Sequence, residues 1–274
     1  MTRSQANTQA QSPAPTPAAA GTHHAFVSDA YGPRARDYLT CAVHSSGEDL
    51  DWIEARVRGQ SAARALDLGC GGGHVAYRVS PHVASVVAVD LSAQMLDTVT
   101  RTAAERGLTN ITAKQSAVES LPFESGEFDF VLSRFSAHHW HNFEAGLREA
   151  RRVMKPNGRA IFIDSYSPAI ALLDSHLQTL ELLRDLSHVK NYTAAEWTAA
   201  LGRAGFEVMS MQARRIRIEF ASWVARTRTS TLLVETIRQF QQNAPEEVRR
   251  AFDFEPDGSF MLDVIGCEAR GSAL

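Results

Sequence analysis

The chain has 274 residues, 44% of them hydrophobic and 22% charged, fractions that are ordinary for a soluble globular protein. Its 28 Lys and Arg residues against 31 Asp and Glu residues give a net charge of −3, so the basic excess typical of nucleic-acid-binding proteins is missing. No uninterrupted apolar run approaches the roughly 20 residues that a membrane-spanning helix needs, which excludes an integral membrane protein.

Residues 1–24 are rich in Ala, Gln, Thr, Pro and Ser, and Arg3 is the only Lys, Arg, Asp or Glu residue before Asp29. The stretch lacks the apolar core of a secretory signal and the arginine content of a transit peptide. With so little apolar content it is expected to remain a disordered tail.

From Ala63 onward, short apolar runs alternate with longer amphipathic segments. Strands are predicted at residues 63–68, 85–90, 111–114, 128–133 and 159–164. Ser92 is suited to cap the helix after the second strand, and Gly107 is suited to end it. Another helix is predicted from residue 143 to 154, and residues 155–158 are expected to stop it. This alternation predicts a parallel sheet with right-handed crossovers and helices on both faces.

The C-terminal part has a different pattern. Helices are predicted over residues 170–189, 193–201 and 223–250, and strands over residues 206–219 and 260–267. The alternation Arg-Ile-Arg-Ile at residues 215–218 is typical of a strand with one solvated face, and a recognition site for an acidic ligand is the alternative. Asp257 and Gly258 predict a tight turn before the last strand.

The strongest motif is Asp67-Leu-Gly-Cys-Gly-Gly-Gly73, which directly follows a predicted strand and opens a helix. Glycines let the backbone turn sharply and approach a ligand closely, and ligands bind at the carboxyl ends of the strands in such sheets. Asp90 ends the next strand, where a carboxylate can accept hydrogen bonds from both hydroxyls of a ribose. The alternative is that Asp67 and Asp90 only cap helices or turns.

Two cofactor classes use this geometry. The nicotinamide and flavin fingerprint GxGxxG/A places a pyrophosphate at a helix N-terminus, but its third glycine position is His74 here. Asp67 would repel a pyrophosphate and attract the ammonium of an amino-acid group. Both departures favour S-adenosylmethionine over NAD or FAD.

Five motifs follow one another between residues 63 and 164: Asp67–Gly73, Val89–Ser92, Leu121–Phe123, Phe128–Ser133 and Arg152–Gly158. Together they resemble class I S-adenosylmethionine-dependent methyltransferases of type 11, the branch typified by ubiquinone/menaquinone C-methyltransferases. Four further segments resemble an uncharacterised bacterial YafE-like subgroup over almost the whole folded chain: Tyr38–Thr40, Ser133–Trp140, His188–Tyr192 and Phe220–Arg226.

The resemblance implies an α/β fold with a Rossmann-like, seven-stranded, mostly parallel sheet, helices on both faces, an antiparallel last strand and extra C-terminal helices as a lid. Residues 63–274 would form the methyltransferase domain, with a helical insertion at about 221–250. Residues 25–62, which include Tyr31, would form an N-terminal helical segment that closes over the cofactor.

The resemblance also places residues against the cofactor: Asp67, Gly69, Cys70, Gly71, Asp90, Leu91, Met95, Val118, Glu119, Ser133, Arg134 and Tyr38. The glycine loop would line the methionine part, although Cys70 within it is more typical of a small space-filler than of a nucleophile. Asp90 would hold the ribose and Leu91 would pack on the adenine. Many relatives have Asp where this chain has Ala117, so the backbone near Val118 is expected to read the adenine edge.

His138-His-Trp-His141 allows three interpretations. A metal site is disfavoured because no Cys or Glu residues nearby complete a ligand set, and no metal is expected. His138 or His139 could be a general base that takes a proton from an acceptor hydroxyl or an activated carbon. These histidines could also cap the following helix or pack in the acceptor cavity.

The expected acceptor is a small molecule, methylated by in-line displacement on O, N or C. Enzymes that methylate amino groups of DNA bases carry an Asp/Asn-Pro-Pro-aromatic motif where this chain has Ser133–Ser136, and the net charge is acidic. No nucleic-acid partner and no membrane span are therefore expected. A non-catalytic S-adenosylmethionine-binding protein and a Rossmann oxidoreductase remain as alternatives.

The cysteines are consistent with an intracellular setting. Cys41, Cys70 and Cys267 are odd in number and far apart, so they predict neither a disulfide framework nor a CxxC metal site. A reducing, cytoplasmic location fits this pattern best.

Overall fold

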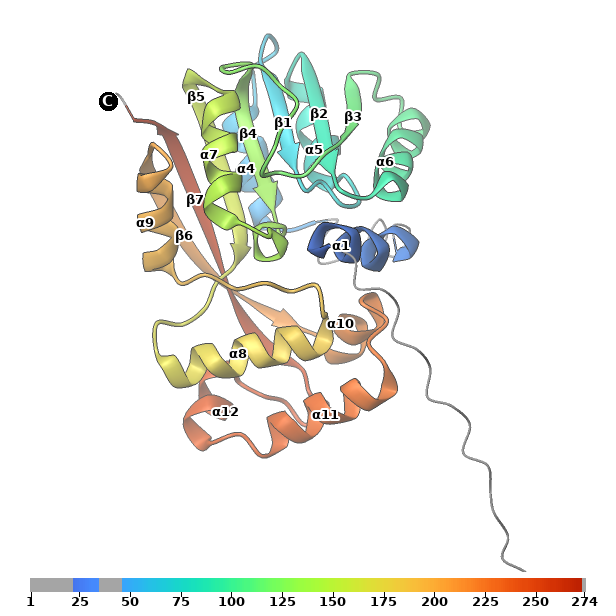
Figure 1. The fold of residues 1–274 in the computed structure, drawn as a ribbon, viewed down its shortest axis with the longest axis vertical. Coiled ribbons are helices and arrows are strands. Elements are labelled where there is room, and N and C mark those ends of the chain that lie inside the picture. The colour runs from blue at the N-terminus through green and yellow to red at the C-terminus, as the bar shows by residue number, and fades with distance from the viewer. Residues whose placement is uncertain (1–21, 35–45, 273–274) are drawn as a thin grey trace, which may run out of the picture.

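The computed structural model describes residues 22–34 and 46–272, and a single seven-stranded sheet forms its centre (Figure 1). The strands are β1 (Arg64–Leu68), β2 (Ser85–Asp90), β3 (Ile111–Gln115), β4 (Phe128–Arg134), β5 (Met154–Ser165), β6 (Phe206–Ile218) and β7 (Phe260–Gly271). Their order across the sheet is β3-β2-β1-β4-β5-β7-β6. The first five strands pair in parallel, and β7 is antiparallel to both β5 and β6. The predicted fold class and the direction of the last strand are confirmed.

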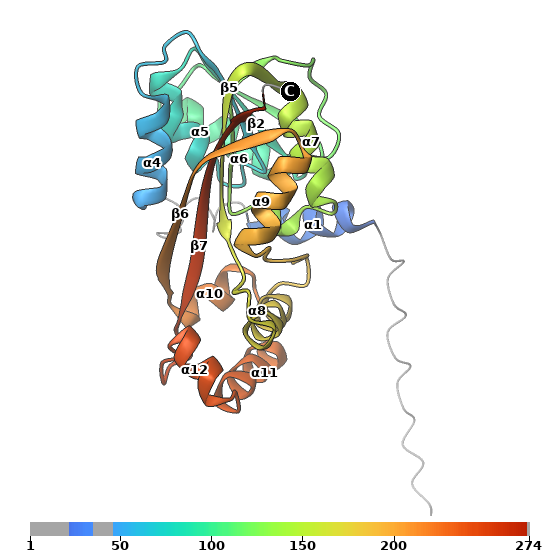
Figure 2. The ribbon, with the colours of Figure 1, turned by 90° about the vertical axis from the view of Figure 1, so that its left-hand side faces the viewer.

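Helices cover the parallel part of the sheet on both faces. The helices α4 (Glu48–Val57), α5 (His74–Val79) and α6 (Ala93–Glu105) bury their apolar sides with Ala65, Val86 and Leu132. The helices α7 (Phe143–Val153) and α9 (Ala194–Arg203) pack on the opposite face with Leu66 and Phe162 (Figure 2). Central strands buried on both faces explain why β1 and β2 are almost continuously apolar in sequence.

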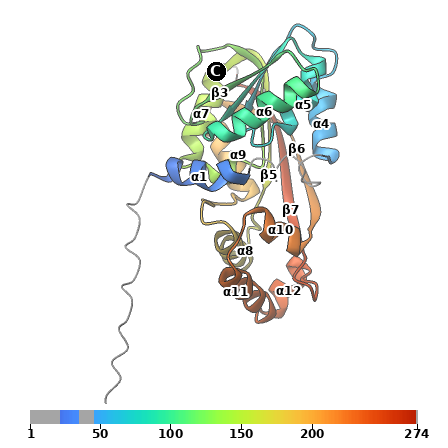
Figure 3. The same cartoon turned by 90° about the vertical axis from the view of Figure 1, so that its right-hand side faces the viewer.

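A second, mostly helical layer lies beyond the carboxyl ends of the parallel strands. It consists of α8 (Ala171–Arg184), α10 (Phe220–Arg226), α11 (Thr231–Gln242) and α12 (Glu246–Phe252). The long strands β6 and β7 extend from the sheet into this layer, as the side views show (Figures 2 and 3). A separate apolar cluster holds it together, with Trp223, Phe220 and Phe260 at its centre.

Three predicted boundaries are wrong. Residues 155–158 do not form a stop after a helix but belong to β5, where a register shift opposite β4 accommodates them. The helix predicted over residues 223–250 is three helices, because Arg228 adopts a left-handed backbone and Ser230 starts a new helix as its N-cap. The helix predicted to reach residue 189 ends at Arg184.

The N-terminal helix α1 (His23–Tyr31) and the short 3-10 helix η1 (Gly32–Arg34) lie beneath the carboxyl ends of the parallel strands (Figure 1). The helix α1 begins within the stretch that was expected to be tail. Tyr38 and Cys41, which the sequence analysis singled out, lie outside the described residues. No helix in residues 22–34 and 46–272 has the length and apolar character needed to cross a bilayer.

Candidate functional site

The glycine loop between β1 and α5 has the sharp turns that its sequence predicts. Gly69, Gly71 and Gly73 all have positive φ angles of +64°, +50° and +83°, a region that residues with a Cβ rarely occupy. A Cβ on Gly69 would lie 1.8 Å from the Ser136 hydroxyl oxygen, whereas one on Gly71 would meet nothing within 4 Å. The loop is therefore packed against the segment after β4 at Gly69 and open at Gly71.

Asp67 lies at the end of β1 with only 1% of its surface exposed. Its Oδ2 accepts a hydrogen bond of 3.1 Å from the backbone N–H of Ala76 at the start of α5. Burial, with a further contribution from the charge of Asp90, raises the pKa of the Asp67 carboxyl to about 7. The Asp67 carboxylate therefore accepts a hydrogen bond from the N-terminus of α5. A cationic ligand beside it would lower its raised pKa.

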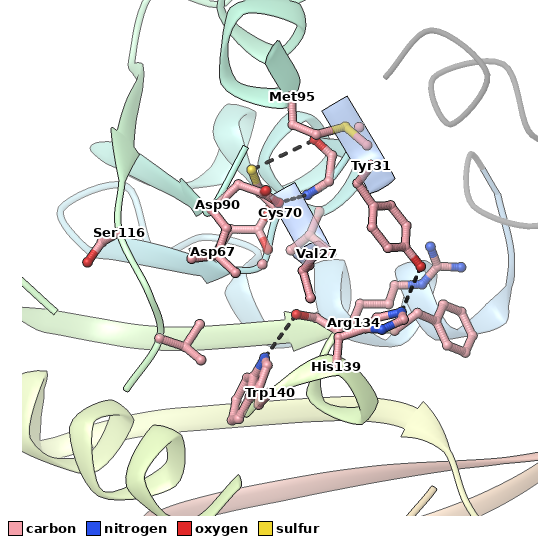
Figure 4. Close-up of a pocket in the computed structure, with 18 of the residues that line it drawn as sticks. Val27, Tyr31, Asp67, Cys70, Asp90, Met95, Ser116, Arg134, His139 and Trp140 are labelled. Atoms are coloured by element: carbon pink, nitrogen blue, oxygen red, sulfur yellow. Dashed lines mark hydrogen bonds between the residues drawn. The ribbon is translucent and has the colours of Figure 1, made fainter. Parts of the chain in front are cut away.

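Asp90 ends β2 and organises two neighbouring backbone segments. Its Oδ2 accepts a hydrogen bond of 2.9 Å from Gly71 N–H (Figure 4). Its Oδ1 accepts one of 2.9 Å from Ser92 N–H. Burial raises the pKa of the Asp90 carboxyl, although these backbone N–H groups oppose the shift. Asp90 therefore caps backbone N–H groups of two turns, which is one of the roles considered from the sequence. The same residue also lines a cavity.

These residues line an open cavity whose empty space, including the part open to solvent, is about 940 Å³. Ten of the twelve residues expected at the cofactor lie on its wall: Asp67, Gly69, Cys70, Gly71, Asp90, Leu91, Met95, Val118, Glu119 and Arg134. Ser133 does not, because its hydroxyl is buried and donates to the Leu68 carbonyl. Tyr38 lies outside the described residues.

The far wall of this cavity comes from elements that the motifs do not include. His24, Val27 and Tyr31 reach it from α1, and Tyr31 packs on the buried Met95. The imidazole of His24 lies 3.4 Å from the Glu119 carboxylate, which links α1 to the loop after β3. The N-terminal helix therefore supplies one wall of the cavity.

The segment after β4 supplies cavity residues that the sequence reasoning missed. Phe135, Ser136, Trp140 and His141 all line the wall. Phe135 has a φ of +51°, which is uncommon for a residue with a Cβ and is typical of functional sites. The Trp140 indole N–H donates to the Ser136 hydroxyl at 3.0 Å (Figure 4). Their place directly after a strand that carries site residues is the one signal that could have identified them.

A second cavity, of about 540 Å³, adjoins the first. Its walls come from α1, β5, α8, β6, α10, β7 and the segment after β4: Tyr31, Phe135, His138, His139, Ser165, Glu181, Arg184, Ile216, Ile218, Trp223, Arg226 and Leu262. Tyr31, Phe135 and His139 line both cavities. The helical layer thus roofs a cavity next to the glycine loop, in accord with the expectation of a lid.

The arginines of the C-terminal region separate into two groups. Arg217 pairs with Glu255 at 2.5 Å and Arg215 lies 3.4 Å from Asp263, both on exposed strand surface. Arg226 instead lines the second cavity together with Arg184, which pairs with Glu181 at 3.3 Å. The arginines of β6 therefore lie on a solvated strand face, as predicted. Arg226 does not, because it lines the second cavity.

His138 and His139 lie in the short 3-10 helix η3 (Ala137–His139) and have different surroundings. His138 Nδ1 is 2.5 Å from the Asp164 carboxylate, and its backbone N–H donates to the same side chain. Burial alone would lower the pKa of His138, but the Asp164 carboxylate raises it above the ordinary value. His138 is therefore held as one half of a buried ion pair. It lines the second cavity but not the first.

His139 contacts both the N-terminal helix and the loop after α8. Its Nε2 is 2.7 Å from the Tyr31 hydroxyl (Figure 4). Its Nδ1 is 3.1 Å from the Ser187 carbonyl oxygen. Burial and the neighbouring charge of His138 lower the pKa of His139 to about 3. His139 is therefore neutral at physiological pH.

Two of the other interpretations of these histidines do not fit the geometry. Asn142, and not a histidine, caps α7, with its Oδ1 accepting from Ala145 N–H at 3.0 Å. Within the part of the chain that the structure describes, no group of three or more His, Cys, Asp or Glu side chains is arranged to hold a metal ion. Packing beside a cavity and proton transfer remain.

Comparison with known proteins identifies relatives over most of the chain. The family model for the methyltransferase domain matches residues 66–162. The chain is 46% identical over 201 residues to the uncharacterized protein YafE of Escherichia coli strain K12, which covers 73% of this chain and 97% of that protein. It is 32% identical over 222 residues to the uncharacterized methyltransferase YcgJ of Bacillus subtilis strain 168, covering 81% of this chain and 88% of that protein.

The fold agrees with a solved structure of the same relative. The crystal structure of YcgJ from Bacillus subtilis superposes with a TM-score of 0.78 at 29% sequence identity, covering 83% of this chain and 99% of that one. The match extends well beyond the 97 residues from 66 to 162 that the family model covers.

Proposed function

The chain belongs to the class I S-adenosylmethionine-dependent methyltransferases, and from this premise we propose that it methylates a small molecule bound in the second cavity. The cofactor of the family is S-adenosylmethionine, which supplies a methyl group already activated on a sulfonium sulfur. Family membership also removes the oxidoreductase alternative that the glycine loop left open. The identity of the acceptor and of its binding residues is the proposal.

The observation that carries the proposal is the contact between the two cavities. Tyr31, Phe135 and His139 line both of them, so a donor on one side and an acceptor on the other would meet at these side chains. In-line displacement needs the attacking atom, the methyl carbon and the sulfur in one line, and holding that alignment can contribute roughly 7–11 kcal/mol of the barrier. Two adjoining cavities supply such an alignment.

The residues on the first cavity fit S-adenosylmethionine. Gly71 leaves open space above its backbone, which lets a ligand lie directly on the loop. Asp90 would accept hydrogen bonds from the ribose hydroxyls, and Asp67 would pair with the ammonium group of the methionine part. We assign Leu91 and Met95 to the adenine, together with the backbone near Val118.

The second cavity supports a small acceptor. Its wall combines the apolar side chains of Ile216, Trp223 and Leu262 with the charged side chains of Arg184 and Arg226, a mixture that is typical of small-molecule sites. Side chains of α8 and α10 form part of its wall, which favours a small acceptor over a duplex or a large folded substrate. Of the two histidines considered as a base, His139 is the better candidate because it lines both cavities.

The test uses purified protein, S-adenosylmethionine labelled in the methyl group, and a cell extract divided into small molecules, protein and nucleic acid. We expect label in the small-molecule fraction, at a rate that falls when the second cavity is filled by Leu262→Trp. Calorimetry with S-adenosylhomocysteine serves as the control that the first cavity is intact in this variant.

Each other outcome contradicts part of the proposal. Label in only the protein or nucleic-acid fraction would overturn the small-molecule acceptor. Intact cofactor binding with no label in any fraction would support a protein that binds S-adenosylmethionine without transferring its methyl group. A Leu262→Trp variant that transfers label as fast as the wild type would place the acceptor elsewhere.

A further inference from the structure

Asp185 is a buried carboxylate that no sequence motif identified, and it lies against the junction of the two cavities. It follows the last residue of α8, where the backbone turns extended and ends the helix. Its Oδ2 accepts a hydrogen bond of 2.5 Å from the Tyr31 hydroxyl, and its Oδ1 accepts one of 2.7 Å from the Ser187 hydroxyl. Only 4% of its surface is exposed.

The hydrogen bonds of His139 define which nitrogen carries its proton. Nδ1 faces the Ser187 carbonyl oxygen at 3.1 Å, and a carbonyl can only accept, so Nδ1 bears the hydrogen. Because His139 is neutral, its Nε2 then has a free lone pair, and this lone pair points at the Tyr31 oxygen 2.7 Å away. Among the described residues, no other contact of the ring supplies a hydrogen to Nε2.

The Tyr31 hydroxyl has one hydrogen and two basic neighbours. One is the Asp185 carboxylate at 2.5 Å and the other is Nε2 of His139 at 2.7 Å. If one proton were added to Nε2 of His139, each hydrogen of the group would have an acceptor. Nε2–H would donate to the Tyr31 oxygen, and the Tyr31 hydroxyl would donate to Asp185. The three side chains are therefore placed to receive one proton without rearrangement.

We propose that Tyr31, His139 and Asp185 form a proton-accepting triad, and that the acceptor attacks through a hydroxyl group or an acidic carbon that must lose a proton. This inference rests on the proposed function. Tyr31 and His139 are catalytic residues at the junction of the cavities, and Asp185 is a positioning residue that holds the Tyr31 hydroxyl and balances charge. The triad is complete only when α1 lies over the first cavity.

The chemical step balances with groups at the junction. The acceptor's electron pair forms the bond to the methyl carbon while the carbon–sulfur bond breaks and its pair stays on sulfur. The Tyr31 hydroxyl hydrogen turns from the Asp185 carboxylate and passes to Nε2 of His139, while the Tyr31 oxygen takes the acceptor's proton and donates it in a new hydrogen bond to Asp185. A base that is weak in the resting protein is sufficient, because a hydroxyl oxygen, or the unsaturated carbon of an enol or an electron-rich ring, becomes cationic and strongly acidic when its electron pair takes the methyl group.

The titratable and charged groups around His139 come from several elements. They are Tyr31 and the His23 ring on α1, His138 on η3, Arg184 on α8, and Asp185 and His188 in the loop after α8. Burial would raise the pKa of Asp185, but His139, Arg184 and the hydroxyls of Tyr31 and Ser187 hold it below its ordinary range. Asp185 is therefore a carboxylate at neutral pH.

The first test measures methyl transfer to the small-molecule fraction by Tyr31→Phe, His139→Gln and Asp185→Asn between pH 6 and 9. We expect initial rates at pH 7 at least about tenfold below wild type. The deficit of His139→Gln should shrink as the pH rises, because an acceptor that ionises in solution needs no base. Tyr166→Phe, which removes a phenol hydroxyl from a residue that lines neither cavity, is the matched control and should keep the wild-type rate.

The product tests the acceptor class. Mass spectrometry should show that the labelled product gains CH2 without acquiring a permanent charge, with the methyl group on oxygen or carbon. A quaternary ammonium, a sulfonium or an N-methyl product would overturn the inference. A deficit in the triad variants that is equal at every pH, or rates equal to wild type, would also overturn it.

A second measurement needs no acceptor and separates this inference from the proposed function. In protein labelled with nitrogen-15 histidine and bound to S-adenosylhomocysteine, NMR at pH 7 should show His139 neutral with hydrogen on Nδ1. The signal is assigned by its loss in His139→Gln. A proton on Nε2 would contradict the triad, whereas a wild-type protein that transfers no label would contradict the proposed function alone.

Discussion

The two cavities are built in opposite ways. The cavity proposed for the cofactor is lined mainly by residues that directly follow the parallel strands, among them the glycine loop, Asp67 and Asp90, which meet at one edge of the sheet. The second cavity is formed by side chains from six helices and strands and from the segment after β4, with Tyr31 and Asp185 at its junction 154 positions apart in sequence. A shared cofactor half and a variable acceptor half are what one fold needs to act on many acceptors.

Substitutions in the glycine loop are expected to have the largest effect among the tests of this comparison. Gly69→Ala should lower the free energy of unfolding by about 3 kcal/mol, because it combines left-handed strain with a clash against Ser136. Gly71→Ala, with the same strain but open space around it, should cost only about 1 kcal/mol. Urea unfolding measures both, and equal losses would show that the loop is not packed against the segment after β4.

Asp90 tests the cofactor half directly. Asp90→Ala should weaken S-adenosylhomocysteine binding by about 2 kcal/mol or more, roughly 30-fold, because charge-assisted hydrogen bonds to the ribose and the bond to Gly71 are lost. Asp97→Ala, on the exposed side of α6, is the control and should leave the affinity unchanged. Calorimetry that finds wild-type affinity in Asp90→Ala would remove the ribose assignment.

The carboxyl of Asp67 predicts a pH dependence. Its pKa of about 7 in the ligand-free protein should fall beside an ammonium group, so S-adenosylhomocysteine should bind best above pH 7 and up to about tenfold more weakly per unit below it. Asp67→Asn should bind more weakly at pH 8 and lose this dependence. A variant that keeps the wild-type pH profile would show that another group is responsible.

The same shift has a consequence for the ligand-free fold. A carboxyl whose pKa is raised on folding binds more protons in the folded than in the unfolded state. Its contribution to stability is therefore complete below about pH 4, the ordinary pKa of Asp, and is lost as the pH rises through about 7. Asp67→Asn should remove this fall in stability in thermal unfolding of the ligand-free protein.

The smallest expected effect lies on the acceptor side. Ile216→Ala removes apolar wall from the second cavity and should raise the KM of the identified acceptor by about fivefold, near 1 kcal/mol, with unchanged S-adenosylhomocysteine affinity. Steady-state kinetics and calorimetry on the same preparation measure the two quantities. A comparable loss of cofactor affinity would mean that the cavities do not act separately.

The parallel half of the fold could be predicted because its signals are local. The strand β2 and the N-cap at Ser92 are as predicted, since a buried strand and a cap are each determined by a few neighbouring residues. The stop expected at residues 155–158 failed because pairing with β4 extends β5 through them. Local pattern does not report the register of a neighbouring strand.

The acceptor half could not be predicted to the same extent. Asp185 lies inside a stretch that periodicity assigns to a helix, and its role depends on that helix ending one residue earlier. Tyr31 was noted as part of a lid, but its hydrogen bonds to His139 and Asp185 join three distant segments. From the sequence, His138 and His139 were equivalent candidates for a general base. Tertiary contacts distinguish them, because His138 pairs with Asp164 whereas His139 lies at the junction of the two cavities.

The most direct test of the account is a crystal structure of the protein with S-adenosylmethionine bound. We expect the ribose on Asp90, the ammonium near Asp67, and the methyl group directed between Tyr31 and His139 into the second cavity. A methyl group that points toward solvent, or into a wall closed by the helical layer, would contradict the account that the two cavities hold the donor and the acceptor of one transfer.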